Sequence, residues 1–529
     1  MTNYYISKTG RDSYDGSAAT PWQNIQHAID WLRPSGTSGD VVNIAAGTYG
    51  HRGGDNARDI NFSGLKGNGP ESNWYVFKPQ NPGDSVIINK SGQGTDSYVH
   101  YVDGILLFQW QCQGIIISSL TLKNSDNHGI MLYSGGRTGT IGISGIKIDG
   151  CTVFNCSSSS IYCYNMAEPC RVRNVTYCNN TVYNVNNGGS YNNPTTTSPQ
   201  EAISFSHIEY FNIHHNRLTS YGKEGIDAKS GCRSGSIHHN RIYCYKLSGT
   251  YGWKYRDHGC IYCDGMYNMN KKIDIYNNII SGHNGTGIIV GSEEVDGGSQ
   301  DVNIYNNCIA LKHHPYQYMS DIDSASGITT PNDYTTSYIT NINIYSNSIE
   351  APDGYPLSIN ASTDYVSNVV IKNNIFVGCS YQVFWIKNIT AANSSGRVEI
   401  TNNCFYSYYG AGTTKIARWI GTEYTYAANP EKFGTGAILD LPDYVHSGND
   451  LHLQVTSPCI DIGNPILITE YDLDGILRSY NGTYDIGAYE YDTSMPPVVV
   501  SSTGLITFSG SGRRIRFYNI GGSTRMSFS

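Results

Sequence analysis

Short runs of alternating hydrophobic and polar residues recur along the middle of the chain, and each run ends at a polar turn. Two clear examples are Ile273-Asp274-Ile275-Tyr276 and Ile342-Asn343-Ile344-Tyr345. A period of two residues predicts β-strands that bury one side and expose the other. The runs show no helical period, so this part of the chain is predicted to be all-β.

An Asn-Asn pair, or a variant of it with a different first residue, follows many of these runs. The pairs are Asn179-Asn180, His215-Asn216, His239-Asn240, Asn277-Asn278, Asn306-Asn307, Ser346-Asn347, Asn373-Asn374 and Asn402-Asn403. Their intervals of 24 to 40 residues are typical of a solenoid of stacked β coils. The second Asn suits a corner, because it tolerates the left-handed conformation and its amide can bond the Asn one coil away. The sequence therefore predicts a right-handed parallel β-helix.

Both ends of such a solenoid need a cover, because an open end exposes the core and unpaired strand edges. We expect an N-terminal cap and first strands at residues 1–50, the parallel β-helix at 51–491, and a linker with a short β tail at 492–529. Within the cap, Thr20-Pro21 is predicted to begin a short helix that continues through Leu32.

The tail carries two candidate strands, Gly504–Phe508 and Arg514–Tyr518. A two-stranded ribbon alone is marginally stable. We therefore expect these strands to pair with something beyond their own hairpin, either the last coil or another subunit. Residues 496–529 are thus the candidate segment for self-assembly.

Composition narrows the classes of partner. The 529 residues have a net charge of −8 and no Lys/Arg cluster, so a nucleic-acid partner is not expected. No apolar run is long enough for a transmembrane helix, so no membrane partner is expected. The 43 tyrosines suit stacking on sugar rings. No signal peptide is visible, yet virion proteins need none, and we favour an extracellular, virion or cell-surface location.

The two ends of the chain resemble those of the pectate-lyase-like β-helix superfamily. The phrases that carry the resemblance are Gly10-Arg11-Asp12, Gly16-Ser17, Pro21-Trp22, Ser457-Pro458-Cys459, Asp472-Leu473-Asp474-Gly475 and Asp485-Ile486-Gly487-Ala488. With the coils, the resemblance covers residues 3–491. It implies the β-helix fold, which carries lyases, hydrolases, isomerases and phage spikes.

Ionisable residues gather on consecutive coils between residues 200 and 300. Taking Ile203, Ile226, Ile261 and Ile288 as inward-facing aligns the strands of these coils. Strand alternation then puts Asp227, Lys229, Tyr262 and Asp264 on one outer face. Because coils stack about 4.8 Å apart, Lys229 and Asp264 are predicted to be neighbours.

The carboxyls of Asp264 and Glu293 are predicted to lie roughly 5–6 Å apart, which is the separation of a retaining glycosidase pair. Lys229 would keep Asp264 ionised as the nucleophile. Glu293, just beyond the next strand, would have its pKa raised by the like charge of Glu294 and act as acid/base. The alternative is that these are ordinary solvated charges on the outside of a solenoid.

The same stretch resembles the active-site run of the β-helical β-xylosidases, glycoside hydrolase family 120. The matching segments are Lys223–Gly231, Gly259–Gly265 and Ile288–Glu293. The resemblance implies that Asp264 is the nucleophile and Glu293 the acid/base, with an oligo- or polysaccharide such as a β-xyloside as substrate. Those enzymes carry an inserted β-sandwich, and no insertion of that size is visible here.

The remaining polar residues of these coils are candidates for substrate binding, and hydrolysis by two carboxyls requires no cofactor. These candidates are Glu201, Glu224, Asp227, Arg233, His258 and Tyr262.

Two other functions remain open. In a Ca²⁺-dependent uronate lyase, Lys229 would be the base, Arg233 or His258 the acid, and Glu224 and Asp227 ligands of Ca²⁺. In a structural or glycan-binding fibre or spike protein of a virion or cell surface, the site would be vestigial.

Overall fold

The computed structural model describes most of the chain. The described residues are 1–50, 60–90, 103–134, 142–164, 172–185, 201–221, 224–245, 259–265, 268–283, 286–292, 297–312, 326–330, 338–352, 354–360, 366–378, 383–387, 397–408, 417–419, 422–478, 483–491, 515–520 and 523–528. They fall into two units, Met1–Glu490 and Tyr491–Ser529, which are described separately.

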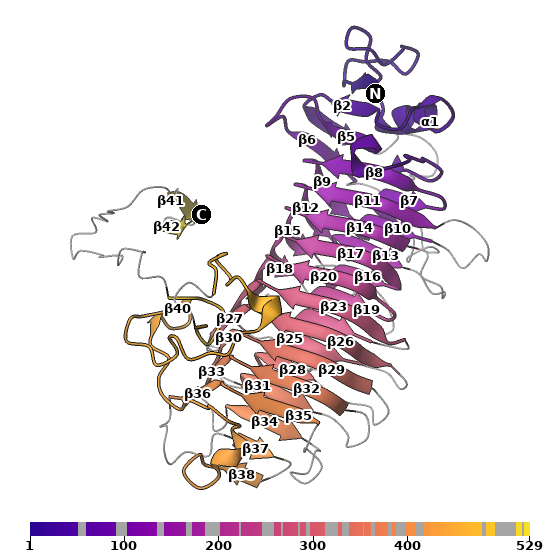
Figure 1. Ribbon diagram of the computed structural model, residues 1–529. Helices are drawn as coiled ribbons and strands as arrows, with labels where there is room; N and C mark the ends of the chain where they lie inside the picture. The colour runs from indigo at the N-terminus through magenta and orange to yellow at the C-terminus, as the bar shows by residue number, and fades with distance from the viewer. Residues whose placement is uncertain are drawn as a thin grey trace. The chain divides into compact units, whose positions relative to one another are not determined.

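The first unit consists mainly of three long sheets, through which the chain passes in turn (Figure 1). Sheet A contains β1 (Asn3–Ile6), β2 (Val41–Ile44), β5 (Tyr75–Pro79), β8 (Gln113–Ser118), β11 (Ile143–Asp149), β14 (Val172–Cys178), β17 (Ile208–His214), β20 (Arg233–His238), β23 (Asn270–Tyr276), β26 (Gly298–Tyr305), β29 (Tyr338–Tyr345), β32 (Val366–Lys372) and β35 (Val398–Thr401). Sheet B contains β3 (Gly47–Gly50), β6 (Val86–Asn89), β9 (Thr121–Ser125), β12 (Thr152–Cys156), β15 (Thr181–Val185), β18 (Arg217–Tyr221), β21 (Arg241–Tyr245), β24 (Ile279–His283), β27 (Cys308–Lys312), β30 (Ser348–Ala351), β33 (Ile375–Gly378) and β36 (Cys404–Ser407). Sheet C contains β4 (Ile60–Asn61), β7 (Gly104–Gln109), β10 (His128–Tyr133), β13 (Ile161–Tyr164), β16 (Glu201–Ser206), β19 (Glu224–Lys229), β22 (Gly259–Asp264), β25 (Thr286–Gly291), β28 (Ile328–Thr330), β31 (Leu357–Asn360), β34 (Phe384–Lys387), β37 (Ala417–Trp419) and β38 (Thr422–Tyr424).

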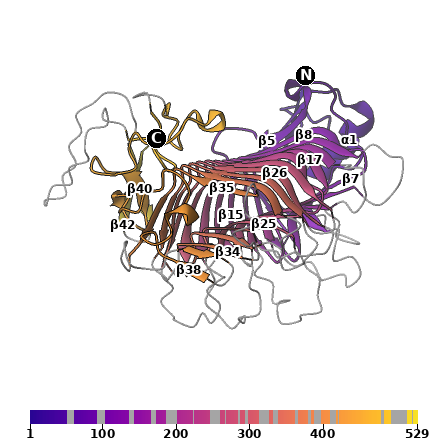
Figure 2. The same cartoon turned by 60° about the horizontal axis from the view of Figure 1, so that its bottom comes forward.

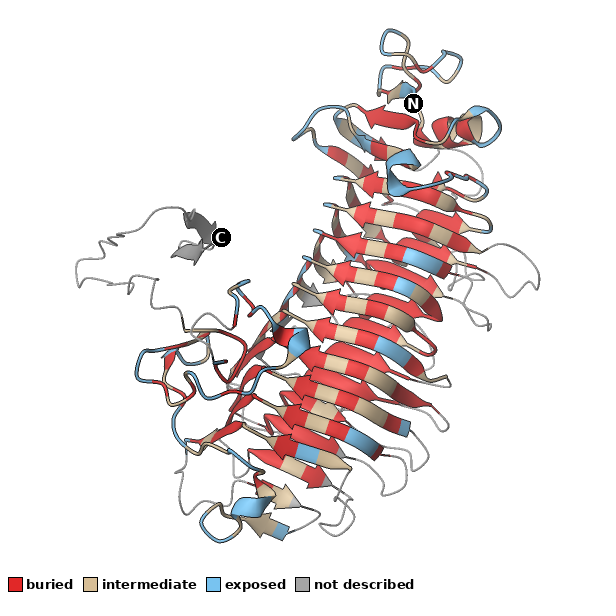
Figure 3. Ribbon diagram, viewed as in Figure 1, coloured by how far each residue is buried: buried red, intermediate tan, exposed pale blue. Residues whose placement is uncertain are grey.

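Neighbouring strands in each sheet come from successive coils and run parallel; the pair β37–β38 is antiparallel. The turned view shows β5, β8, β17, β26 and β35 following one another in a single sheet (Figure 2). This confirms the predicted all-β parallel β-helix. The isoleucines used to align the coils, Ile203, Ile226, Ile261 and Ile288, are all fully buried, and buried positions recur along the three long sheets (Figure 3).

An internal ladder of asparagines joins the coils at the corner between sheets A and B. The side-chain amide of Asn240 donates to Oδ1 of Asn278, and that of Asn278 donates to Oδ1 of Asn307, both at 3.0 Å. The predicted bond between coils is therefore confirmed.

The predicted left-handed position in each Asn-Asn pair is wrong by one residue. Asn277 has φ +52° and His239 has φ +53°, so the first residue of the pair makes the left-handed turn. The second Asn is free to point inward and bond its neighbours.

The N-terminal end is covered by helix α1 (Ile25–Ser35), which buries Ile25, Ala28, Ile29 and Leu32. The helix begins at Ile25, so the predicted start at Thr20-Pro21 is wrong. Trp22 instead bridges to Ile6 of β1 and stacks on Tyr4. That contact keeps the preceding residues extended, and Asn24 takes the N-cap position.

The segment after β38 folds back against the coil corners. It contains two 3₁₀ turns, η4 (Pro430–Lys432) and η5 (Leu467–Thr469), and the antiparallel pair β39 (Tyr444–His446) and β40 (Asp450–Leu453). A further 3₁₀ turn, η1 (Glu71–Asn73), precedes β5. Arg478 is fully buried and donates to Oδ1 of Asn306 at 2.9 Å. The closing motifs of the sequence are thus part of the first unit.

The second unit contains the antiparallel hairpin β41 (Ile515–Ile520) and β42 (Ser523–Phe528). The candidate strand Arg514–Tyr518 overlaps β41, whereas Gly504–Phe508 lies outside the described residues. Within the described part of this unit, β41 pairs with β42. Among the described residues, the structure has no helix that is long and apolar enough to cross a membrane.

Candidate active site

Three adjacent strands of sheet C, β16, β19 and β22, carry the polar residues singled out in the sequence. Lys229 of β19 is paired in register with Asp264 of β22, as the isoleucine alignment predicts. Asp227, two residues before Lys229, is paired with Tyr262. Because residues two apart on a strand share a face, Asp227, Lys229 and Asp264 belong to one surface of the sheet.

The acidic side chains on these strands are buried. Glu201 and Glu224, paired at the starts of β16 and β19, are 2% and 1% exposed, and Asp227 and Asp264 are fully buried. Carboxylates are almost never buried unless they are paired. The interpretation of these residues as ordinary solvated charges is therefore wrong. We call Glu201, Glu224, Asp227, Lys229 and Asp264 the carboxylate cluster.

Lys229 supplies the positive charge of the cluster. Its Nζ lies 2.5 Å from Oε1 of Glu201 and 3.5 Å from Oδ2 of Asp227, and its side chain is 21% exposed. Burial disfavours the charged form, but Glu201 and Asp227 outweigh it and hold the pKa of Lys229 well above its ordinary value. Lys229 is therefore a fixed cation at neutral pH.

Asp227 is the carboxyl whose proton affinity is most clearly altered. Burial raises its pKa well above the ordinary value, and Glu224 adds to the effect against the pull of Lys229. Neither carboxylate oxygen of Asp227 has a hydrogen-bond donor among the described residues. A buried carboxyl with a raised pKa holds a proton more readily than one in solvent.

Aromatic residues on the preceding coil, which the sequence analysis did not single out, border the cluster. Tyr162 of β13 is paired with Ser204 of β16 and stacks on His128 and Tyr164, with ring centroids 4.7 and 5.4 Å apart. Ile161 is paired with Ile203, so extending the isoleucine alignment by one coil would have found these rings.

The remaining predicted residues lie elsewhere or outside the described part. Arg233 begins β20 in sheet A, where it is paired with Glu209 and Lys271; it is therefore not on the strands of the cluster. His258 and Glu293 fall outside the described residues. Gly291, the last residue of β25, is paired with Asp264, which places Glu293 two residues beyond the strand that adjoins Asp264.

The cluster contains oxygen ligands of the kind that Ca²⁺ prefers. Carboxylate oxygens of Glu201, Glu224 and Asp227 lie within 4.8 Å of one another, and Ca²⁺ is held by such oxygens at 2.3–2.6 Å. The donor set fits this ion, although the ammonium of Lys229 already lies against two of the three carboxylates. A bound cation would have to displace that ammonium.

No protein-family model and no curated protein matches the chain. The solved structures that it resembles include a complex of XylC with xylose (TM-score 0.48, 10% identity, 79% of this chain and 86% of the other). A rhamnogalacturonan lyase has a TM-score of 0.46 at 13% identity, and the match covers 76% of this chain and 87% of the lyase. The pectate lyase Pel9A has a TM-score of 0.38 at 13% identity, and the match covers 93% of this chain and 97% of Pel9A. Similarity at these TM-scores and identities does not identify the activity of this chain.

Proposed function

We propose that the protein is a carbohydrate-active enzyme that hydrolyses β-xylosides or related oligosaccharides with retention of configuration. The observation that carries the proposal is the carboxylate cluster itself, in which four buried acids share one lysine on three adjacent strands. Burying this many charges costs several kcal/mol per ion. A purely structural surface of the solenoid does not require buried charges. Glycoside hydrolysis, in contrast, depends on carboxyls whose environments differ.

In this mechanism Asp264 attacks the anomeric carbon and forms a glycosyl-enzyme intermediate. The cation of Lys229, in register on the neighbouring strand, favours the ionised form of Asp264. Glu293, which follows the next strand, protonates the leaving group and then deprotonates the attacking water. The partly exposed ring of Tyr164, which stacks on the buried Tyr162, offers flat apolar surface for a sugar ring.

One observation favours a second function, a Ca²⁺-dependent uronate lyase. The oxygens of Glu201, Glu224 and Asp227 fit Ca²⁺, which would acidify the proton next to the uronate carboxylate. Lys229 would then have to act as base. The ammonium of Lys229 already lies against Glu201 and Asp227, where Ca²⁺ would have to bind, and so we place hydrolysis first.

The experiment compares wild-type protein with Asp264→Asn on aryl β-xylosides and xylo-oligosaccharides. We expect the variant to lose at least about 10⁴-fold in kcat/KM, since an amide cannot form the intermediate. Glu399→Gln is the matched control, because Glu399 lies on β35 of sheet A in an exposed ion pair with Lys372. Full activity of Asp264→Asn, or equal loss in both variants, would overturn the assignment.

A further inference from the structure

A second group of ionisable side chains lies on the other side of the coil, at the corner between sheets A and B. His214 and His238 end β17 and β20 and are paired in register. His215 and His239 follow them at the turn, with φ +55° and +53°. Because His-His-Asn occurs in two successive coils, four imidazoles come together where the adjoining coils carry Cys178-Asn179 and Tyr276-Asn277.

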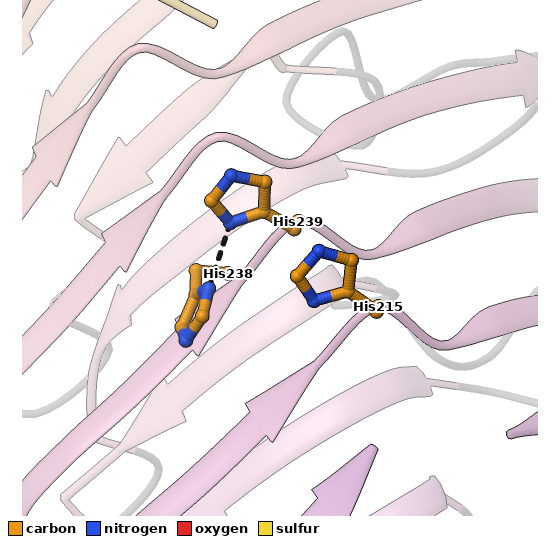
Figure 4. A group of neighbouring side chains, drawn as sticks. All are labelled: His215, His238 and His239. Carbon is orange, nitrogen blue, oxygen red and sulfur yellow. Dashed lines mark hydrogen bonds between the residues drawn. The ribbon is translucent and has the colours of Figure 1, made fainter. Parts of the chain in front are cut away.

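The rings form two parallel stacks that meet at nearly right angles. The stacked pairs His214–His238 and His215–His239 have centroids 4.9 and 4.8 Å apart, at angles of 6° and 4°. Across the stacks, Nδ1 of His238 lies 2.7 Å from Nδ1 of His239, as Figure 4 shows. Two neutral imidazoles this close share one proton, so one Nδ1 donates and the other accepts with its lone pair.

From these contacts we propose that His215, His238 and His239 bind a transition-metal ion, with Zn²⁺ as the expected ion. One nitrogen from each ring lies within 4.8 Å of the others. Around tetrahedral Zn²⁺, with Zn–N bonds of 2.0–2.1 Å, ligand nitrogens lie about 3.3 Å apart. To close that difference of up to about 1.5 Å, His215 and His239 must rotate out of their stack, and His239 must exchange a contact with His238 or Asn277 for the ion.

The electrostatics favour neutral imidazoles, the form that binds metal. Burial and the neighbouring rings lower the pKa of His238 to about 3, and burial with His215 lowers that of His239 to about 4. Burial also lowers the pKa of His215. The fourth ring, His214, contacts Nδ1 of His215 at 2.8 Å, a bond of the kind that orients a metal-bound imidazole.

The site is separate from the carboxylate cluster, which lies on sheet C. A metal held by residues of two coils would connect those coils and stabilise the folded chain, as far as it binds the folded chain more tightly than the unfolded one. Imidazole ligands suit Zn²⁺, Cu²⁺ and Ni²⁺ better than Ca²⁺.

The test uses the full chain without a polyhistidine tag, stripped with chelator and titrated with Zn²⁺ at pH 7 in a calorimeter. The informative variant is His215→Asn/His238→Tyr/His239→Asn. Asn stands at the equivalent turn in Asn277, and Tyr276 is paired in register with His238, so these replacements suit the coil. His446→Gln, which alters an exposed histidine of β39, is the matched control.

We expect one Zn²⁺ per wild-type chain, binding at least about 100-fold weaker in the triple variant, and unchanged binding in the control. Zn²⁺ should raise the Tm of wild type and leave that of the triple variant unchanged. Equal binding by wild type and triple variant would overturn the proposal. Should the variant not fold, wild type loaded with Co²⁺ decides: a spectrum of imidazole-bound Co²⁺ supports the site, and that of the hydrated ion refutes it.

Discussion

Lys229 and Asp264 are paired on β19 and β22, yet the ammonium of Lys229 lies 2.5 Å from Glu201 on the opposite neighbouring strand. One cation therefore serves acids on both sides, including Asp227 at 3.5 Å. Because each carboxylate depends on the same charge, the cluster must respond as a unit when that charge is removed.

Lys229→Met should lower the free energy of unfolding by about 3 kcal/mol at pH 7, because it leaves buried carboxylates without their cation. The deficit should shrink at pH 5, where those carboxyls take up protons. Urea denaturation at both pH values measures it. Lys372→Met, which breaks an ion pair with the 53% exposed Glu399, should cost no more than about 1 kcal/mol. A similar cost for both variants would contradict the assigned role of Lys229.

The asparagine ladder should dominate the stability of the central coils. Asn278 is fully buried; it donates to Asn307 and to the carbonyl of Ile237, and it accepts from Asn240. Asn278→Ala should cost about 3 kcal/mol, since it leaves several buried partners unsatisfied. Asn303→Ala removes a part-buried Asn from sheet A and should cost less than about 1 kcal/mol. Thermal unfolding of the two variants compares these values directly.

The back-folded segment should lose stability at alkaline pH. Burial lowers the pKa of His452, but its hydrogen bonds to Asp450 and Asp474 outweigh burial and raise that pKa to about 10. Because the pKa of His452 is higher in the folded than in the unfolded chain, its charge stabilises the fold fully below the unfolded-state pKa of about 6.5. That contribution disappears as pH rises through about 10.

The test is His452→Gln. Its stability deficit relative to wild type should be largest at pH 6 and should vanish near pH 10, and it should stay near 1 kcal/mol because the group is partly exposed. A deficit that does not change with pH would show that the contact is not ionic.

The register of the site could be predicted from the sequence, because strand alternation and one inward isoleucine per coil leave no freedom in which residues are neighbours. That reasoning placed Lys229 beside Asp264. It could not show that Lys229 also reaches back to Glu201, because side-chain direction between two equidistant strands is not encoded in spacing. Burial of Asp227 likewise depends on its neighbours in space.

Two local predictions failed for physical reasons. The left-handed turn lies at the first residue of the Asn-Asn pair, as at Asn277, since the second Asn is needed inward for the ladder. Helix α1 begins at Ile25 because Trp22 packs against Tyr4. The histidine group forms because the same pair, His214-His215 and His238-His239, occupies equivalent positions in two successive coils. The sequence shows this directly, since both pairs precede the Asn of a variant repeat.

Removal of divalent cations should separate the two candidate chemistries. If hydrolysis by two carboxyls is correct, a chelator should change kcat/KM on a xylo-oligosaccharide by less than about twofold, since no metal takes part. Activity that is lost with chelator and restored by Ca²⁺, with unsaturated products that absorb in the near ultraviolet, would favour the lyase. The readout is the rate together with the product spectrum.

The most direct test of the central claim is to trap the intermediate. A 2-deoxy-2-fluoro-β-xyloside with a good leaving group slows breakdown of a glycosyl-enzyme, so wild type should gain the mass of one fluorosugar, and peptide mass spectrometry should place it on Asp264. Asp264→Asn should gain none. An adduct on Glu201, Glu224 or Asp227, or turnover of β-xylosides with inversion at the anomeric carbon, would contradict the account.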